Sequence, residues 1–118
     1  MIQVKAIVQQ ALALHKEGRL AEAKALYEEI VKLEPRHFDA LHLLGVIPFQ
    51  RRNPEVAVAL MGKALELNPN SAAAHSNRGC ALNQLDRFDE ALASCDRAIA
   101  LRPDYAEAYN NRGNALYD

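Results

Sequence analysis

The residues in this sequence that could carry out chemistry are four histidines, two cysteines and scattered carboxylates. No two histidines are four residues apart, so no helical face presents the paired imidazoles that hold zinc in metalloproteases. Cys80 and Cys95 form no CxxC pair, and we expect them on different helices, which disfavours a disulfide. Phosphate loops, nucleophile elbows and catalytic carboxylate pairs are also missing. We therefore predict that the chain is not an enzyme and holds no metal and no cofactor.

A second set of residues suits binding. The carboxy-terminal half contains a group of amides and one hydroxyl: Ser76, Asn77, Asn83, Gln84, Asn110, Asn111 and Asn114. The corresponding residues of the amino-terminal half are apolar: Val8, Leu12, Leu43, Val46 and Phe49. Amides both donate and accept hydrogen bonds, so a row of them can bind a peptide backbone whatever its side chains. The alternative is that the amides only solvate an exposed helix face.

A repeat of 34 residues must position these side chains. Pro35, Pro69 and Pro103 recur at this interval within the motifs LEPRHFDA, LNPNSAAA and LRPDYAEA. Two columns of small residues keep the same interval, Ala11, Gly45, Gly79 and Gly113 in one and Ala23, Ala57 and Ala91 in the other. An internal repeat of this length predicts a solenoid in which each unit packs on its neighbours.

Each unit is expected to contain two helices, because apolar residues recur at spacings of three and four. The predicted helices cover residues 2–17, 20–33, 38–51, 54–67, 72–85, 88–101 and 106–117. Gly18 lies in the first turn, and Asn53 and Pro54 lie in the second, where Asn can cap the next helix and Pro tolerates its first position. Turns this short predict antiparallel neighbours.

The fold class follows from these helix pairs. We predict an all-α fold, a right-handed superhelix of antiparallel helix pairs with about three repeats plus one extra terminal helix. The units cover approximately residues 4–37, 38–71, 72–105 and, in part, 106–118, within a single domain over 1–118. Gly45 or Gly79 facing Ala57 or Ala91 would let paired helices approach closely, and the first helices would line a concave groove.

Composition limits the partners and the compartment. Fourteen Lys and Arg oppose fifteen Asp and Glu, so the net charge of -1 creates no attraction to nucleic acid or anionic lipid. No stretch approaches the ~18 continuous apolar residues that a membrane span needs. Two cysteines without a disulfide framework favour reduced thiols, so we expect a cytoplasmic location.

The repeat resembles the tetratricopeptide repeat (TPR) family. Gly79, Phe88, Ala91, Ala98 and Pro103 match the family pattern most closely, and the resemblance covers nearly the whole chain. The pattern is broken at Cys95, where an aromatic residue is usual, and at His75, where a large apolar residue is usual. The resemblance implies a scaffold that binds an extended peptide or a partner protein in its concave groove.

Two subtypes of the family can be compared with the groove. Asn77 and Asn111 match the asparagine ladder of the repeat domain of O-linked N-acetylglucosamine transferases, which the third unit resembles, although Gln9 and Leu43 in the same column do not. A further implied alternative is therefore a targeting fragment of a larger glycosyltransferase-like protein. The carboxylate clamp for acidic chaperone tails needs Lys and Asn where this sequence has Val8 and Leu12, so we expect no clamp.

Pro48 breaks the repeat inside the third predicted helix, in the column of Leu14, Leu82 and Leu116. A proline there removes one backbone hydrogen bond at a cost of about 3 kcal/mol or more. We expect the helix to kink or end near Ile47. The kink is either absorbed by the neighbouring turns or serves as a hinge between the two halves of the array.

The last predicted helix has no second helix after it, yet its NNRGNAL repeats the internal SNRGCAL. Gly113 would then stand ready for a partner helix. We expect either that the sequence is part of a longer protein or that another copy covers this surface. The competing functional hypothesis is thus a self-associating structural module, as a homodimer, a domain-swapped dimer or a stacked array.

Overall fold

The computed structural model of the protein describes residues 3–50 and 52–117, including all their side chains except those of 48–50 and 117. Within this part seven helices follow one another: α1 (Val4–Lys16), α2 (Leu20–Leu33), α3 (Phe38–Gln50), α4 (Pro54–Leu67), α5 (Ala72–Gln84), α6 (Phe88–Leu101) and α7 (Ala106–Tyr117). Each lies within two residues of its predicted bounds at either end, and the described residues include no strand. The all-α prediction is confirmed.

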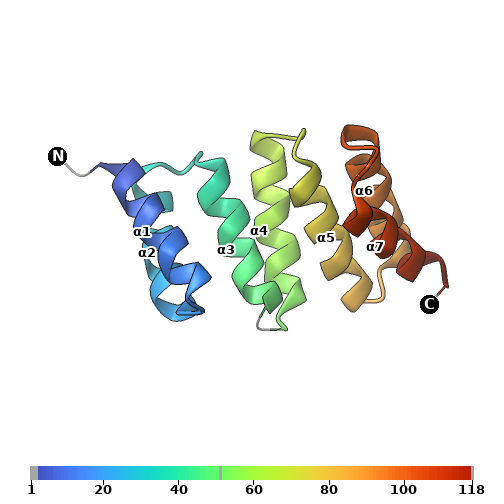
Figure 1. The fold of residues 1–118 in the computed structure, drawn as a ribbon, viewed down its shortest axis with the longest axis horizontal. Helices are drawn as coiled ribbons and strands as arrows, with labels where there is room; N and C mark the ends of the chain where they lie inside the picture. Colours follow the sequence, from blue (N-terminus) through green and yellow to red (C-terminus); the bar gives the residue numbers. More distant parts are fainter. Residues whose placement is uncertain (1–2, 51, 118) are drawn as a thin grey trace.

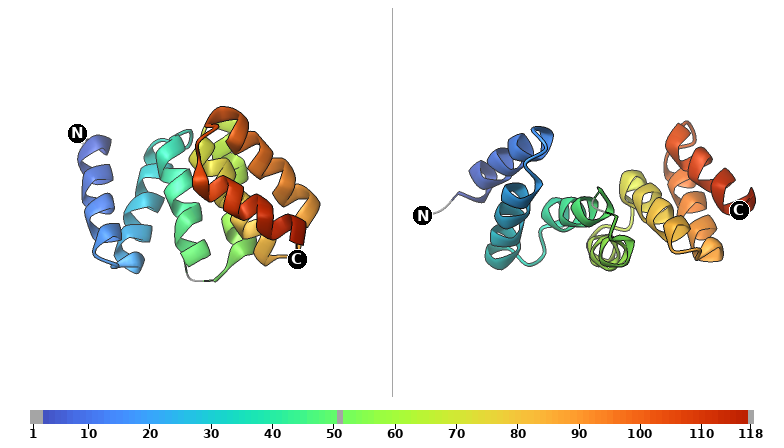
Figure 2. Two further views of the ribbon diagram at one scale, coloured as in Figure 1. Left: turned by 45° about the vertical axis from the view of Figure 1, so that its right-hand side comes forward. Right: turned by 90° about the horizontal axis from the view of Figure 1, so that it is seen from below.

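The helices form antiparallel pairs that stack into an elongated row of 49 × 25 × 22 Å (Figure 1). Seen from below, α1, α3, α5 and α7 follow one side of the row, and α2, α4 and α6 follow the other (Figure 2). The row curves toward the first helices, so these lie on its inner side as predicted.

The turn inside each unit depends on one residue in the left-handed conformation. Gly18, Arg52 and Asp86 have φ angles of 78, 60 and 58°, and they are 34 residues apart. Glycine adopts this conformation without steric cost, whereas Arg52 and Asp86 adopt it against their intrinsic preference. The sequence pattern identified only the glycine, because the other two residues carry no comparable local signal.

The predicted glycine seams are confirmed by the distances around them. A Cβ on Gly79 would lie 2.7 Å from Cys95 Sγ, and a Cβ on Gly45 would lie 2.9 Å from Met61 Cγ. Both positions therefore need glycine so that the paired helices can approach closely. A Cβ on Gly113 would meet no described atom within 4 Å.

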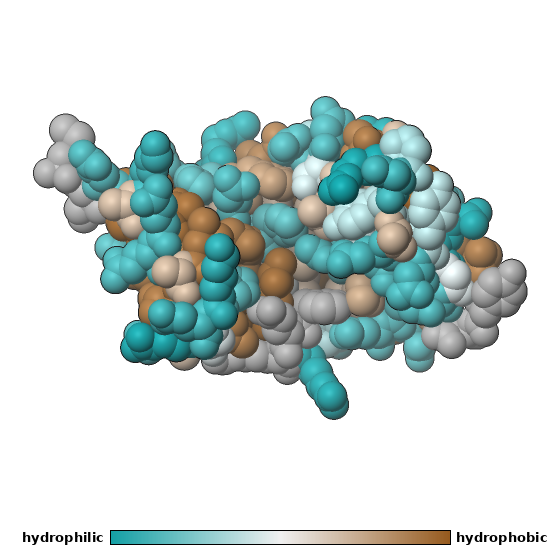
Figure 3. Space-filling view, in the orientation of Figure 1, coloured by the Kyte–Doolittle hydropathy of each residue, from teal (hydrophilic) through white to brown (hydrophobic). Residues whose placement is uncertain are grey.

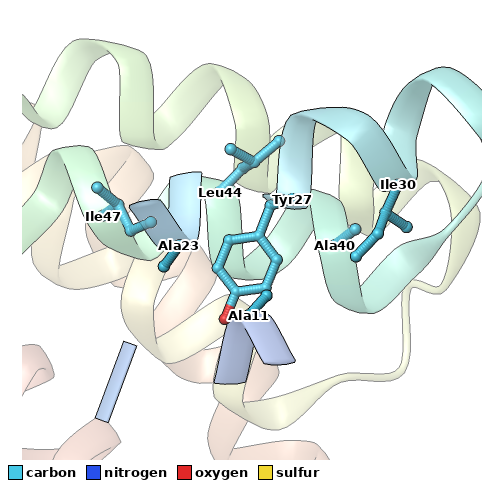
Figure 4. Close-up of a cluster of buried hydrophobic side chains, with 7 residues drawn as sticks. All are labelled: Ala11, Ala23, Tyr27, Ile30, Ala40, Leu44 and Ile47. Carbon is cyan, nitrogen blue, oxygen red and sulfur yellow. The ribbon is translucent and has the colours of Figure 1, made fainter. Parts of the chain in front are cut away.

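Buried apolar side chains form two clusters. The first joins α1, α2 and α3 and consists of Ala11, Ala23, Tyr27, Ile30, Ala40, Leu44 and Ile47 (Figure 4). The second joins α4, α5, α6 and α7 and consists of Ala57, Val58, Met61, Ala81, Leu82, Ala91 and Ala115. The boundary between the clusters falls between α3 and α4, which are the two helices of one unit.

The α3 helix continues through Pro48 to Gln50. An end at Ile47, one of the two outcomes expected from the sequence, is therefore wrong. Only two residues of α3 follow the proline, and α3 packs closely on α4 at Gly45, one turn before it. The side chains of Pro48 and Phe49 lie outside the described residues, so the proposed hinge at Pro48 stays a prediction.

Candidate functional site

The first helices follow the inner side of the row, where the sequence predicts the groove, and the amino-terminal part of this surface is apolar. Its described side chains are Val8 and Leu12 on α1 and Leu43 and Val46 on α3. Leu12 is 37% exposed, and the other three are half-buried. Figure 3 shows apolar residues gathered over α1 and α3 on the face that carries these helices, whereas hydrophilic residues predominate over α5 and α7. We call the Val8, Leu12, Leu43 and Val46 surface the apolar half of the groove.

The carboxy-terminal part carries the six predicted amides, and we call it the amide half. Gln84, Asn110 and Asn114 are exposed, Asn77 and Asn83 are half-buried, and Asn111 is only 9% exposed. The three exposed amides make no hydrogen bond to other described residues, whereas each of the remaining three does. The six amides therefore divide into a free group and a structural group.

Asn111 joins the last two first helices. Its Nδ2 donates to the backbone oxygen of Ser76 at 3.1 Å and to Ser76 Oγ at 3.2 Å. Ser76 is fully buried, so it does not line the groove as its sequence position suggested. Because these bonds connect α7 to α5, Asn111 contributes to packing between units, and its amide nitrogen is already occupied.

Asn77 makes the equivalent connection one unit earlier. Its Nδ2 donates to His42 Nε2 at 3.1 Å, and the two residues are 35 apart, as are Asn111 and Ser76. Burial lowers the pKa of His42, and the Asp39 carboxylate partly opposes this shift. Sequence reasoning missed the role of His42, although its 35-residue separation from Asn77 was a signal that could have revealed it.

Asn83 completes the structural group. Its Nδ2 donates to the backbone oxygen of Asn111 at 2.9 Å. Its Oδ1 is buried without a hydrogen-bond partner among the described residues. Asn83 therefore anchors α5 to α7 with its donor, and its acceptor is the one polar atom of the structural group that the described residues leave unsatisfied.

The two cysteines are unsuited to chemistry. Cys80 is half-buried in the amide half, where burial and the Glu107 carboxylate raise the pKa of its thiol. Cys95 is fully buried on α6, and burial raises its pKa to about 11. Both thiols therefore stay protonated near neutral pH, and the protonated form is neither a nucleophile nor a metal ligand.

Neither a metal cluster nor a membrane-spanning helix occurs among the described residues. No cluster of three or more His, Cys, Asp or Glu side chains within residues 3–50 and 52–117 could hold a metal ion. Of the helices that the structure describes, none has both the length and the apolar character to cross a membrane. The first helices thus carry apolar side chains toward the amino-terminal end and amides toward the carboxy-terminal end.

Family models agree with the repeat. A tetratricopeptide repeat model matches residues 8–72, which is more than half of the chain, and a second such model matches residues 60–93. A TPR repeat model matches residues 79–118. Protein FlbA of Caulobacter vibrioides is 30% identical over 82 residues, which are 70% of this chain and 14% of FlbA. The chain therefore spans a small part of this relative.

Two solved structures are similar in fold. A mutant O-GlcNAc transferase of Thermobaculum terrenum matches with a TM-score of 0.90 and 27% identity, over 99% of this chain and 24% of that one. The first TPR of Spaghetti (RPAP3) bound to the HSP90 peptide SRMEEVD matches with a TM-score of 0.92 and 23% identity, over 96% and 90% of the two chains. The second likeness, at this identity, concerns the fold alone.

Proposed function

The chain belongs to the tetratricopeptide repeat family, and from this premise we propose that it binds an extended peptide segment of a partner protein in its groove. The observation that carries the proposal is the free group of amides, Gln84, Asn110 and Asn114, which are exposed on α5 and α7, two of the first helices that follow the inner side of the row. An extended peptide exposes backbone N–H and C=O groups that such amides can bond, and an apolar side chain of the ligand would bury against Leu12 and Val46.

The ligand class is supported by the solved TPR of Spaghetti, which holds a peptide on a similar fold. Its acidic peptide is not proposed as the ligand here, because Val8 and Leu12 occupy the positions where a carboxylate clamp would need Lys and Asn. We propose an uncharged segment with one large apolar residue, and no catalysis by this chain alone.

The test is selection of ligands from a displayed library of random peptides, followed by calorimetry with the selected peptide. Replacing Gln84, Asn110 and Asn114 with alanine should weaken binding by about tenfold or more, since each lost hydrogen bond is worth ~0.5–1.5 kcal/mol. These side chains are exposed, so the fold should persist, which circular dichroism checks. Glu66→Ala on α4 is the matched control, and equal affinity of the triple variant and this control would refute the groove.

A second candidate function, self-association, is favoured by the open face of α7. Tyr109 and Leu116 are 50% and 48% exposed there, whereas Leu82, the counterpart of Leu116 on α5, is fully buried. A helix from a second copy could cover this apolar face. Leu116→Glu should then shift the mass measured by light scattering toward the monomer, and a monomer mass independent of concentration in the unaltered chain would exclude this function.

The cellular location of the chain and its role beside a catalytic domain are also proposals. A cytoplasmic location is proposed from the two cysteines without a disulfide framework, and a targeting role beside a glycosyltransferase domain is proposed from the similarity to a transferase of which this chain covers 24%. The sequence of the complete gene product tests the targeting role directly. A catalytic domain beside the repeats would support this role, and a gene product without one would exclude it.

A further inference from the structure

A cleft of about 390 Å³ lies between α2 and α4, and α3 forms its floor. None of its lining residues belongs to the first-helix groove. Figure 2 shows α2 and α4 on the same side of α3, away from the inner side of the row. The cleft is lined by Lys24 and Glu28 from α2, Leu44 and Ile47 from α3, and Asn53, Val56 and Leu60 from α4. Its volume is within the ~300–1,000 Å³ of typical ligand pockets.

At the rim of the cleft, the residues at the start of α4 differ from those at the equivalent positions of α2 and α6. Arg19 and Glu22 form an ion pair at 2.8 Å at the start of α2, and Arg87 and Glu90 form the same pair at the start of α6. The corresponding residues at the start of α4, 34 positions from each pair, are Asn53 and Val56. Val56 is 43% exposed, and Asn53 makes no capping bond with its side chain. The charged pair of the other units is thus replaced by an uncharged pair, of which Val56 is apolar.

The floor of the cleft is also less polar than the equivalent surface of the third unit. Arg78 Nη1 donates to Ser94 Oγ at 3.0 Å, and the residues 34 positions earlier are Leu44 and Leu60. A polar bridge in the third unit is therefore an apolar surface in the second. All these departures fall in one unit and line one cavity, so they alter a single surface.

Glu28, on the α2 wall of the cleft, lacks the ion pair that its counterpart Asp96 forms on α6. Arg112 Nε on α7 donates to Asp96 Oδ1 on α6 at 2.8 Å. Two periods earlier the same two positions hold Leu44 and Glu28, so Glu28 lines the cleft without the arginine that its counterpart Asp96 has. Neither Glu28 nor Lys24, one helical turn away, forms an ion pair with a described residue.

We propose that this cleft docks an amphipathic α-helix of a partner protein, at a site separate from the proposed peptide groove. The walls are helices whose backbone groups are already bonded, so an extended peptide over Leu44, Val56 and Leu60 would lose its hydrogen bonds to water without replacement. A helix satisfies its own backbone. Its apolar ridge enters the cleft, an arginine pairs with Glu28 as Arg112 pairs with Asp96, and an acidic residue one turn away pairs with Lys24.

The probe is a blocked alanine-based helical peptide with leucines along one face and, beside them, an arginine and a glutamate one turn apart. Titrated into ¹⁵N-labelled protein, it should shift NMR signals of the cleft-lining residues of α2, α3 and α4. Absence of shifts, or shifts centred on the first-helix groove, would overturn the proposal. Binding that is lost in the Gln84, Asn110 and Asn114 alanine variant would likewise assign the peptide to the groove and overturn it.

Variants at the cleft sharpen this test. Leu44→Arg should bridge Glu28 internally and weaken peptide binding by about tenfold. Val56→Lys at the exposed rim is the second blocking variant, should Leu44→Arg not fold, and Leu33→Lys is its matched control because Leu33 is an exposed apolar residue of α2 outside the cleft. An equal loss in the Leu33 and Val56 variants would show unspecific apolar adhesion and refute the site.

The ion pair has its own readout. Glu28→Gln should weaken binding of the arginine peptide, and it should leave binding of a peptide with alanine in place of that arginine unchanged. Equal effects on the two peptides would exclude the proposed pairing and, with it, the stated chemistry of the partner helix.

Discussion

The seam between the first and second units and the seams farther along the chain join similar helices by different means. At the early seam Val8 and Leu43 pack against one apolar cluster shared by α1, α2 and α3, whereas at the later seams the first helices are joined by the Asn77 to His42 and Asn111 to Ser76 hydrogen bonds. Apolar contacts stabilise without direction, whereas hydrogen bonds between buried groups also fix the relative position of the helices.

The outer sides of the seams differ in the same way. The late seam carries the Arg112 to Asp96 bond, and the early seam leaves a cleft with Glu28 unpaired. One repeat architecture therefore accommodates both a register fixed by hydrogen bonds and an open apolar surface. The difference predicts that the two ends of the array respond separately to damage.

Tyr27→Ala should have the largest effect. Tyr27 is fully buried in the first cluster, and its hydroxyl lies 3.1 Å from His15 Nδ1. Truncation of such a side chain costs about 3–5 kcal/mol. Hydrogen exchange should show α1 and α2 losing protection while α5, α6 and α7 keep it. Tyr27→Phe, which keeps the ring, is the control, and a uniform loss of protection along the chain would show that the seams are equally strong.

Alanine at Gly79 and at Gly113 compares a closed seam with an open one. Gly79→Ala should lower the free energy of unfolding by about 1–3 kcal/mol, because the new Cβ would overlap Cys95 Sγ. Gly113→Ala should raise it by up to about 1 kcal/mol, because alanine favours the helix and meets no described atom. Urea denaturation measures both changes, and a loss in the Gly113 variant would mean that another helix covers α7.

Asn111→Ala and Asn114→Ala compare a structural amide with a free one. The first substitution removes both hydrogen bonds from Asn111 to Ser76 and should cost about 1–2 kcal/mol. The second removes an exposed side chain and should change stability by less than about 0.5 kcal/mol. Thermal unfolding monitored by circular dichroism distinguishes the two, and equal costs would contradict the division of the amides.

A change of pH should have the smallest effect and should act on the middle seam. Burial lowers the pKa of His42 in the folded state below its unfolded value near 6.5. The free energy of unfolding therefore loses nothing to protonation of His42 above this pH. Stability should fall as the pH decreases from about 6.5 through the folded pKa, since the unfolded chain takes up the proton first. Burial also lowers the pKa of His75, so protonation of His75 should reduce the stability further as the pH falls.

His42→Gln isolates the contribution of His42 to this pH dependence. Glutamine can accept the Asn77 hydrogen bond but does not titrate, so the urea midpoint of the variant should fall less between pH 7 and pH 5 than that of the unaltered chain. Superimposable pH profiles would exclude His42 as a source of the effect.

Much of the fold could be predicted because its signals are local. The 34-residue interval, the prolines after the second helices and the glycines opposite alanines all act within one unit, and each was confirmed where the structure describes it. The turn residues Arg52 and Asp86 were missed, because their left-handed conformation is imposed by the helices on either side. The candidate site was harder to predict, because it depends on contacts between units.

The sequence by itself determined the repeat, the helix pairs and the change from apolar to amide residues along the first helices. Tertiary structure alone decided which amides are free, because Asn111 and Asn77 meet Ser76 and His42 only when units stack 35 residues apart. It also decided that Leu44, Val56 and Glu28 share a cleft. Periodicity specifies which residues occupy equivalent positions, whereas the contacts between unlike residues in neighbouring units decide what each position does.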